Sequence, residues 1–246
     1  MNFCCIEGLP VDNFRVMAEI IEISSIREVH RFLDHKTHLF LDLDNTILTS
    51  VSEFGGEGWE KFMIAHFVES GMSPKEAHTC ATHLWKAVQT VSEIEFVEDE
   101  TNTFINALQH PCFAITARDF AFRAVTRGQL NALNIQFSRC NTPFTLNEPD
   151  YSEGVFYCGD VPKGKVLRWY ADHHPGCRIV LVDDLRPHLE KASEFLDNFV
   201  GLRYGFLDDR KARYSPCEVT KLLGRLITHP EAKLFLKKVC DFGHNS

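Results

Sequence analysis

The sequence of 246 residues lacks an apolar run near the roughly 20 residues that a membrane-spanning helix needs. Residues 1–10 also lack the basic region followed by an apolar stretch that marks a signal peptide. No dense stripe of lysine and arginine is present, and the net charge is −8. We therefore expect a cytoplasmic protein without nucleic acid or a membrane as its partner. Secretion as an effector by another route stays open.

Cysteine pairs of the CxxC type, internal repeats and low-complexity stretches are missing as well. The nine cysteines are an odd number and are scattered along the chain, which is typical of reduced thiols rather than of a disulfide framework. What is present has the usual globular balance, because hydrophobic residues make up 44% and charged residues 24% of the chain. The length suits one α/β domain with an insert.

Short apolar stretches alternate with helical patterns over most of the chain. The stretch at residues 38–44, His-Leu-Phe-Leu-Asp-Leu-Asp, is typical of a central parallel strand covered on both sides, with polar residues at its carboxyl end. This alternation predicts parallel crossovers and a three-layer, Rossmann-like α/β sheet. We expect further strands at residues 16–23, 112–116, 155–158, 178–183 and 199–204, and helices at 26–34, 98–109, 120–133, 163–171 and 187–196.

Residues 50–97 differ in character and predict a helical insert. Ser73 followed by proline is typical of a helix N-cap with proline at the first helical position. We therefore assign residues 1–49 and 98–246 to a core domain and residues 50–97 to a cap. The cap contains two helical patterns, at residues 59–70 and 74–91.

Two carboxylates stand at the end of the first buried strand. Asp42 and Asp44 are two residues apart, so alternation along the strand directs both side chains to one side. A carboxylate nucleophile can take a phosphoryl group and form an aspartyl-phosphate. A second carboxyl group beside it can protonate the leaving group and later deprotonate water. We therefore predict Asp42 and Asp44 as a catalytic pair.

Further polar residues follow the next strands. Thr116 ends the second buried strand and offers a hydroxyl donor to a phosphoryl oxygen, and Lys163 stands at the head of a helix. Asp183 and Asp184 end a third apolar strand and supply hard oxygen ligands for Mg²⁺. The ion and the lysine together offset the charge of a transferring phosphoryl group. Lys165 stays an alternative to Lys163, and the shares of Asp183 and Asp184 in binding the ion stay open.

These residues resemble, in their order along the chain, the four motifs of the haloacid dehalogenase-like (HAD) superfamily, and in finer detail an uncharacterised bacterial branch of it. The resemblance covers about residues 37–204. It implies a capped, magnesium-dependent phosphatase that acts on a phosphorylated small molecule. The implied roles are nucleophile and metal ligand for Asp42, acid/base and backbone metal ligand for Asp44, phosphate anchors for Thr116 and Lys163, and metal ligands for Asp183 and Asp184.

Several alternatives stay open at this point. The same motifs serve a phosphotransferase or phosphomutase, and a non-catalytic scaffold of this kind serves as an effector or regulatory binding protein. Arg118 either contacts a substrate anion or forms a salt bridge at the start of a helix. The acidic run from Glu93 to Glu100 is expected to be a solvated helix start. The substrate, the pathway and the oligomeric state are not determined by these patterns.

Overall fold

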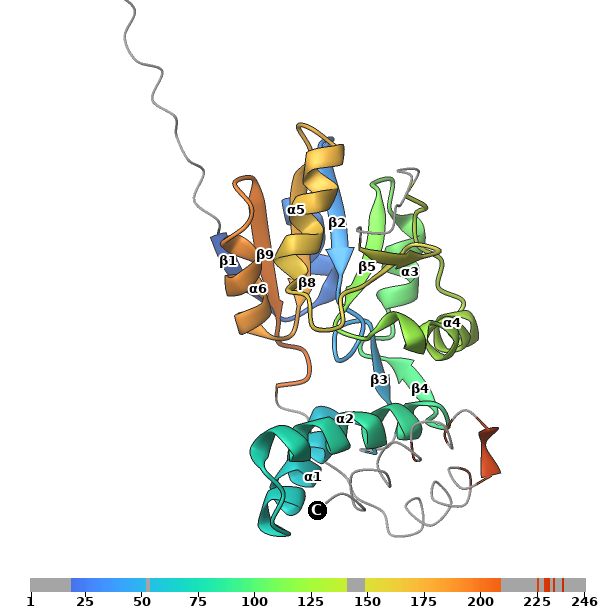
Figure 1. The fold of residues 1–246 in the computed structure, drawn as a ribbon. Helices are drawn as coiled ribbons and strands as arrows, with labels where there is room; N and C mark the ends of the chain where they lie inside the picture. The colour runs from blue at the N-terminus through green and yellow to red at the C-terminus, as the bar shows by residue number, and fades with distance from the viewer. Residues whose placement is uncertain are drawn as a thin grey trace, which may run out of the picture.

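The computed structural model describes residues 19–51, 54–140 and 149–208, together with residues 225, 228–230, 232 and 236. A seven-stranded sheet with the order β1-β9-β8-β2-β5-β7-β6 forms its centre (Figure 1). Its strands pair in parallel except for β6, which runs antiparallel to β7. The predicted α/β class with a mainly parallel sheet is therefore confirmed. The strands are β1 (Glu19–Ile23), β2 (Thr37–Leu41), β5 (Cys112–Thr116), β6 (Asp150–Ser152), β7 (Val155–Tyr157), β8 (Arg178–Asp183) and β9 (Phe199–Tyr204).

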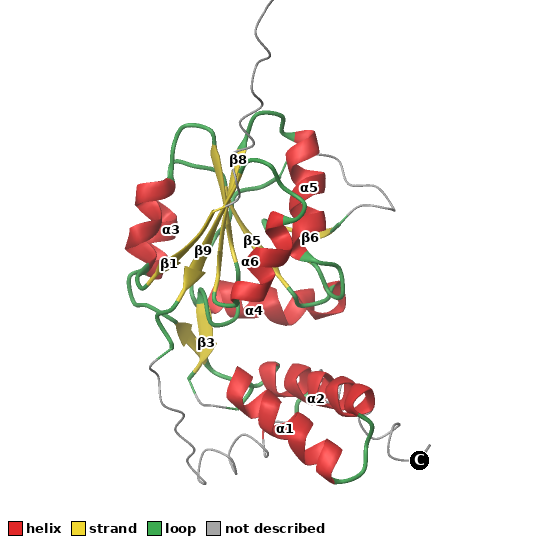
Figure 2. Cartoon of the chain, turned by 90° about the vertical axis from the view of Figure 1, so that its left-hand side faces the viewer, coloured by secondary structure: helices red, strands yellow, loops and turns green. Residues whose placement is uncertain are grey.

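Helices cover both faces of this sheet, as Figure 2 shows with α3 on one side and α5 and α6 on the other. Alternation along β2 separates two apolar clusters: Leu39 and Leu41 contribute to one, and Phe40 to the other. Since each buried side chain of this size contributes about 1.5–3 kcal/mol, the two clusters hold the three layers together. The covering helices are η1 (Ile26–Phe32), α3 (Thr101–Ala107) and α4 (Arg123–Ala132) around the first cluster, and α5 (Lys163–His173) and α6 (Arg186–Ser193) around the second.

Several elements differ from the sequence expectation at their ends. The capping box of Ser25 is present, but the helix it starts is a 3₁₀ helix. A 3₁₀ turn, η2 (Phe120–Phe122), precedes α4 where one helix was expected. β6 was not predicted, because Asp150–Ser152 lack the apolar run by which the equally short β7 is recognised. Residues 16–18 of the first predicted strand lie outside the described residues.

Two helices, α1 (Glu57–Glu69) and α2 (Pro74–Gln89), form a pair beyond the carboxyl ends of the strands (Figure 1). Pro74 and the capping box of Ser73 start α2 as the sequence indicates. An antiparallel ribbon of β3 (Leu48–Ser50) and β4 (Ile94–Phe96), which was not predicted, joins this helical pair to the sheet. The ribbon brings the two ends of the insert together. The predicted insert boundaries, at residues 50 and 97, fall at the end of β3 and just after β4.

Glu98 corrects the expectation that the acidic run is solvated. Its side chain is buried, with 9% exposure. The carboxylate accepts hydrogen bonds from Ser25 Oγ at 2.7 Å, from the Ile26 backbone N–H at 2.8 Å and from the Tyr204 hydroxyl at 2.8 Å. Glu98 therefore joins the start of η1 to the end of β9, because buried polar groups need partners of this kind.

Replacing Glu98 by methionine is expected to lower the free energy of unfolding by about 3 kcal/mol, since three donors would lose a charged acceptor. Urea denaturation measures this change. Glu100→Gln is the matched control, because Glu100 is more exposed and pairs with the exposed Arg27; its effect should stay within about 0.5 kcal/mol. An equal effect of both variants would contradict the structural role of Glu98.

Candidate active site

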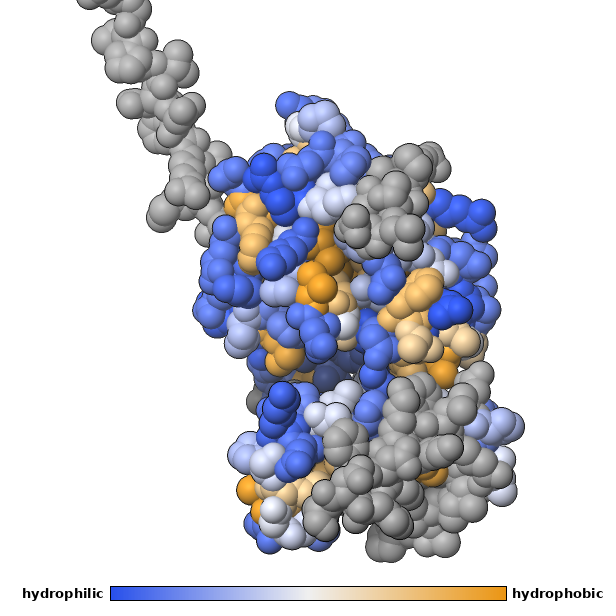
Figure 3. Space-filling view, in the orientation of Figure 1, coloured by the Kyte–Doolittle hydropathy of each residue, from blue (hydrophilic) through white to orange (hydrophobic). Residues whose placement is uncertain are grey.

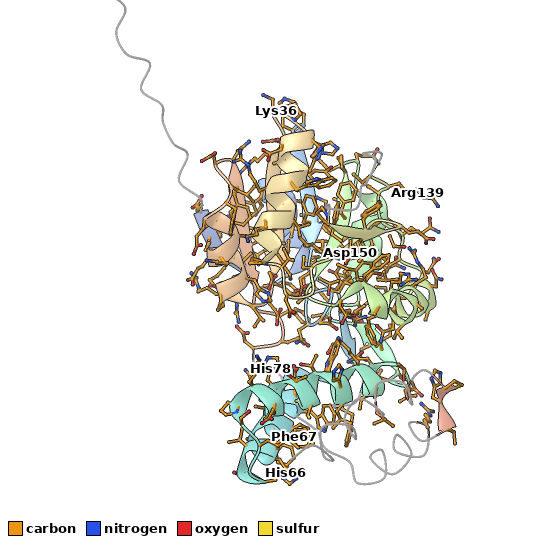
Figure 4. All side chains as sticks on the ribbon, viewed as in Figure 1. Lys36, His66, Phe67, His78, Arg139 and Asp150 are labelled. Carbon is orange, nitrogen blue, oxygen red and sulfur yellow. The ribbon has the colours of Figure 1, made fainter. Side chains whose placement is uncertain are left out.

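The predicted site residues meet at one edge of the sheet. Asp42 directly follows β2, Thr116 is the last residue of β5, and Asp183 is the last residue of β8. β2 pairs in parallel with both β5 and β8, so the three strands end side by side. The edge faces the helical pair: in Figure 4, Lys36, which precedes β2, lies at the opposite end of the core from His78 of α2.

Lys163 lies between two buried carboxylates. Its Nζ donates to Asp42 Oδ1 at 2.6 Å and to Asp183 Oδ2 at 2.6 Å. Lys163, Asp42 and Asp183 are only 5%, 6% and 0% exposed. Lys165, by contrast, is exposed. Of the two lysines that the sequence offers, Lys163 is therefore the one that contacts Asp42 and Asp183.

Gly164 allows α5 to bring Lys163 to this position. A Cβ atom at residue 164 would lie 2.7 Å from Ala192 Cα and 2.6 Å from Phe195 Cδ2, both too close for any larger side chain. The missing side chain thus lets α5 and α6 approach each other closely. The Lys-Gly pair in the sequence places the ammonium group at the head of α5, against the strand ends.

Burial and neighbouring charges shift the ionisation of all three groups. Burial raises the pKa of Asp42 to about 7, against the opposing attraction of Lys163, and the nearby Asp183 adds to the rise. Burial also acts on Asp183, but Lys163 and His188 outweigh it and hold the pKa of Asp183 below its usual value. The two carboxylates in turn raise the pKa of Lys163 against the effect of burial. The lysine is therefore charged at neutral pH. Of the two carboxylates, Asp183 holds its negative charge to lower pH than Asp42 does.

Three carboxylates at this edge lie close enough together that they could hold a metal ion. One oxygen each of Asp42, Asp183 and Asp184 lies within 4.8 Å of the others. Around Mg²⁺, with oxygen ligands at about 2.1 Å, oxygens stand about 3 Å apart in neighbouring positions and about 4.2 Å apart in opposite ones. The three donor atoms are carboxylate oxygens, the ligand type that Mg²⁺ binds in proteins, so the chemistry of these residues fits such an ion.

The turn that follows β2 is joined to the loop that follows β8. Asn45 has φ = 61°, a left-handed conformation that asparagine tolerates better than most residues. The buried Thr46 then accepts a hydrogen bond at its Oγ1 from the backbone N–H of Asp184, at 3.1 Å. Asn45 and Thr46 therefore shape the turn, and Thr46 ties it to the loop that carries Asp184.

The carboxylate of Asp44 lies outside the group of three and pairs with Arg118. Arg118 Nε donates to Asp44 Oδ2 at 2.9 Å, and Arg118 Nη2 donates to Asp44 Oδ1 at 2.7 Å. Of the two roles that the sequence left open for Arg118, the salt bridge is therefore present, and its partner is Asp44. The sequence could not indicate this partner, because the two residues are 74 positions apart.

Thr116 is buried at the end of β5, and its Oγ1 accepts a hydrogen bond from the backbone N–H of Arg118 at 3.1 Å. The hydroxyl can still donate its proton, since a hydroxyl carries one donor besides its acceptor sites. Thr116 also lines the pocket described next. Its position therefore suits a donor to a bound anion.

A cavity of about 600 Å³ lies between the strand ends and α2. Asp42, Asp44 and Asp184 line its sheet side, and Figure 3 shows the surface hollowed between the core and the helical pair. Thr79, Thr82, His83 and Lys86 line its other side at helical spacing along α2. Lys86 also forms a salt bridge with Asp119, which follows β5. The volume suits a small or medium-sized ligand.

His188 is a site residue that the sequence reasoning missed. It lies on α6 and lines the cavity, and its Nδ1 lies 3.1 Å from Asp183 Oδ1. The backbone N–H of Leu185 donates to the same oxygen at 2.9 Å. Together with Lys163, these groups fix the orientation of Asp183. A histidine five residues after a strand-end aspartate was the available signal.

In a comparison with known proteins, the model of one protein family matches residues 19–223 of the chain. This family is described as "Protein of unknown function (DUF2608)". The chain is also similar to proteins named "Putative outer membrane protein". One from Chlamydia muridarum is 24% identical over 185 residues, which are 71% of each chain. One from Chlamydia pneumoniae is 22% identical over 204 residues, 78% of this chain and 77% of the relative. Within the described residues, no helix combines the length and apolar character needed to cross a bilayer.

This family match corrects the assignment made from the motifs. The haloacid dehalogenase-like superfamily, and with it the uncharacterised bacterial branch, was the wrong family, because the model that matches residues 19–223 describes a different one. The motifs are a few residues at strand ends, and such residues report local chemistry rather than descent. Any role for Asp42 and its neighbours must therefore rest on their chemistry and geometry.

Proposed function

We propose that this chain, which belongs to the DUF2608 family, is a magnesium-dependent phosphatase that forms an aspartyl-phosphate on Asp42. The observation that carries the proposal is the buried ammonium of Lys163 between Asp42 and Asp183, together with the cavity that Asp42 lines. An acidic site of this kind can accept a phosphate only when cations offset its charge. The substrate would be a phosphorylated small molecule.

The proposed reaction has two displacements at phosphorus. In the first, an Asp42 oxygen attacks the phosphorus of a phosphomonoester, the bond to the leaving oxygen breaks, and the Asp44 carboxyl group donates a proton to that oxygen. In the second, Asp44 takes a proton from water, the resulting oxygen attacks the same phosphorus, and Asp42 is released with inorganic phosphate. Lys163 and the Thr116 hydroxyl would bind phosphoryl oxygens during both steps.

The donor set suits Mg²⁺ as the cofactor. Asp42, Asp183 and Asp184 offer carboxylate oxygens, the ligand type that this ion prefers. When bound, the ion would offset the charge of the phosphoryl oxygens and help to align the substrate. His188 and Lys163 would keep Asp183 in the orientation that the ion requires.

We also infer that the sheet is Rossmann-like. β2, the strand that leads to Asp42, lies between β5 and β8, and the chain runs from β2 outward to β5 and β7 on one side before β8 and β9 extend the other. In such a sheet, successive strands are added first on one side of β2 and then on the other. Ligands of open α/β sheets bind at the carboxyl ends of the strands where this change of side occurs. The cavity at the end of β2 agrees with that rule.

Hydrolysis of p-nitrophenyl phosphate tests the proposed function. We expect release of p-nitrophenolate with Mg²⁺ and its loss on addition of EDTA, restored by excess Mg²⁺. A panel of phosphorylated metabolites would then identify the substrate. Absence of hydrolysis across the panel with Mg²⁺ present, or hydrolysis that persists in EDTA, would contradict the proposal.

The cation site can be tested without activity. Mg²⁺ should raise the melting temperature, because an ion that binds only the folded chain adds about 2.7 kcal/mol at 100 times its dissociation constant. Asp184→Asn should greatly weaken this stabilisation. Asp172→Asn is the matched control, since Asp172 is exposed on α5 and pairs with Arg168. Equal stabilisation of the two variants by Mg²⁺ would exclude Asp184 as a ligand.

The location of the chain is a separate proposal. The charge and cysteine pattern favour the cytoplasm, whereas the name of the relatives favours the outer membrane. The proposed chemistry needs only Mg²⁺ and a phosphorylated substrate, so it does not decide between them. Cell fractionation followed by immunoblotting distinguishes the two locations.

A further inference from the structure

The side chain of Arg118 is the centre of a buried polar network. Its guanidinium binds both carboxylate oxygens of Asp44, and its Nη1 donates to Gln129 Oε1 at 2.6 Å and to Thr126 Oγ1 at 3.0 Å. Its side chain is 1% exposed, whereas that of Asp44 is 31% exposed. The arginine is thus held inside the protein, while Asp44 remains accessible from the cavity.

The helical pair contributes to this network. Gln129 Nε2 donates to Gln89 Oε1 at 3.0 Å and to the Gln89 backbone oxygen at 3.2 Å, and Gln89 is the last residue of α2. Gln89 Nε2 in turn donates to the Gly55 carbonyl at 2.9 Å. Trp85 of α2 adds a cation–π contact, because the centroid of its ring lies 5.5 Å from Cζ of Arg118. A chain of contacts therefore connects α2 to Asp44.

Arg118 has little capacity left for a substrate. Four hydrogen bonds to protein groups engage its Nε, Nη1 and Nη2 atoms. These bonds fix the orientation of the planar, buried guanidinium. Because it binds the Asp44 carboxylate through two parallel hydrogen bonds, it fixes the orientation of that carboxylate as well. The network is therefore suited to fixing the Asp44 oxygens rather than to binding a ligand.

We propose that Arg118 is the positioning residue for Asp44, and that α2 takes part in the reaction by holding Arg118 through Gln89 and Trp85. The inference rests on the proposed function, because it assigns a support to its acid/base group. Proton donation to a leaving oxygen needs a carboxyl group at a fixed distance and angle. Loss of the arginine's hold would thus impair proton transfer more than it impairs attack by Asp42.

The test compares two substrates of nearly equal shape, p-nitrophenyl phosphate and phenyl phosphate. The phenolate is the poorer leaving group and depends more on a proton from Asp44. The quantity measured is kcat/KM, because it reports the steps up to phosphoryl transfer to Asp42. For Asp44→Asn, kcat/KM with phenyl phosphate should fall by about 100-fold, and with p-nitrophenyl phosphate by much less.

Arg118→Lys should reproduce this selective loss, since lysine cannot bind both oxygens of Asp44 in parallel. We expect kcat/KM for phenyl phosphate to fall at least about tenfold more than for p-nitrophenyl phosphate. Gln129→Met provides a milder variant should Arg118→Lys not fold, and Gln89→Met tests the contribution of α2; both should show the same selectivity. Arg127→Lys on α4 is the matched control, because Arg127 pairs with Glu153 away from the network.

An equal fall for both substrates in these folded variants would show a merely structural role and overturn the inference. Unchanged kinetics of Gln129→Met and Gln89→Met would do so as well. If the unmodified chain hydrolyses neither substrate and none of the phosphorylated metabolites of the panel with Mg²⁺, the proposed function fails first and the inference falls with it. These results are distinguishable, because the first two are seen in the variants and the last in the unmodified chain.

Discussion

Replacing Asp42 by asparagine should lower kcat for p-nitrophenyl phosphate by a factor on the order of 10⁴ or more, the loss typical when a covalent nucleophile is removed. The amide cannot form the acyl phosphate that the proposed reaction requires. Its oxygen can still accept a hydrogen bond from Lys163, which now lies 2.6 Å from Asp42 Oδ1. Because burial raises the pKa of Asp42 to about 7, a neutral group of the same shape should also be tolerated, and the fold should persist.

The covalent intermediate gives this prediction a second readout. Brief reaction with a ³²P-labelled substrate and acid quenching should leave label on the unmodified chain, and hydroxylamine should remove it, as expected of an acyl phosphate. Asp42→Asn should carry no label. Asp172→Asn, which changes an exposed aspartate on α5, should behave like the unmodified chain. Full activity or normal labelling of Asp42→Asn would rule out Asp42 as the nucleophile.

The central sheet was predictable because its longer strands can be recognised from their own residues. The strand expected at residues 112–116 is present as β5 with the same ends, and the one at 178–183 is β8. Continuous apolar runs of five or six residues leave little choice of structure when both faces are buried. The three-residue strands β3, β4 and β6 lack such a signal, since tertiary pairing stabilises them rather than their own composition.

In the candidate site, too, features that depend on neighbouring residues could be predicted, whereas contacts between residues far apart in the sequence could not. Asp42, Thr116 and Asp183 could be predicted, because parallel strands bring their carboxyl ends to one edge. The partner of Arg118 could not, since its contact with Asp44 spans 74 positions. Glu98 is a similar case: the acidic run suggested solvent exposure, yet the Tyr204 hydroxyl, 106 positions away, donates to its carboxylate.

The assignment of a family was the part of the sequence reasoning that failed. The motif residues describe which side chains surround a ligand, and their order along the chain follows from the order of the strands. Neither property is specific to one line of descent, whereas the family model matches the whole stretch of residues 19–223. The proposed chemistry therefore depends on contacts such as those of Lys163 and not on the family.

Lys163→Met should produce the largest loss of stability, about 3–5 kcal/mol in the free energy of unfolding, because it leaves two buried carboxylates without their shared cation. Asp42 and Asp183 each lie 2.6 Å from the lysine ammonium and are 6% and 0% exposed. Without that charge, Asp42 would lose its charged partner, and Asp183 would keep only its contacts with His188 and the Leu185 N–H. Lys165→Met is the matched control, since Lys165 is exposed two residues away, and it should change stability by less than about 0.5 kcal/mol.

A double-mutant cycle shows whether this loss comes from the carboxylates. Adding Asp42→Asn to Lys163→Met removes one of the two unbalanced charges, so the double variant should be more stable than Lys163→Met alone. Residues in direct contact typically show coupling energies of about 0.5–3 kcal/mol. Urea denaturation in EDTA excludes a bound divalent ion that would substitute for the ammonium. If the two substitutions were additive under these conditions, Lys163 would stabilise the fold through the burial of its aliphatic stem, and its charge would not be what holds Asp42 and Asp183 together.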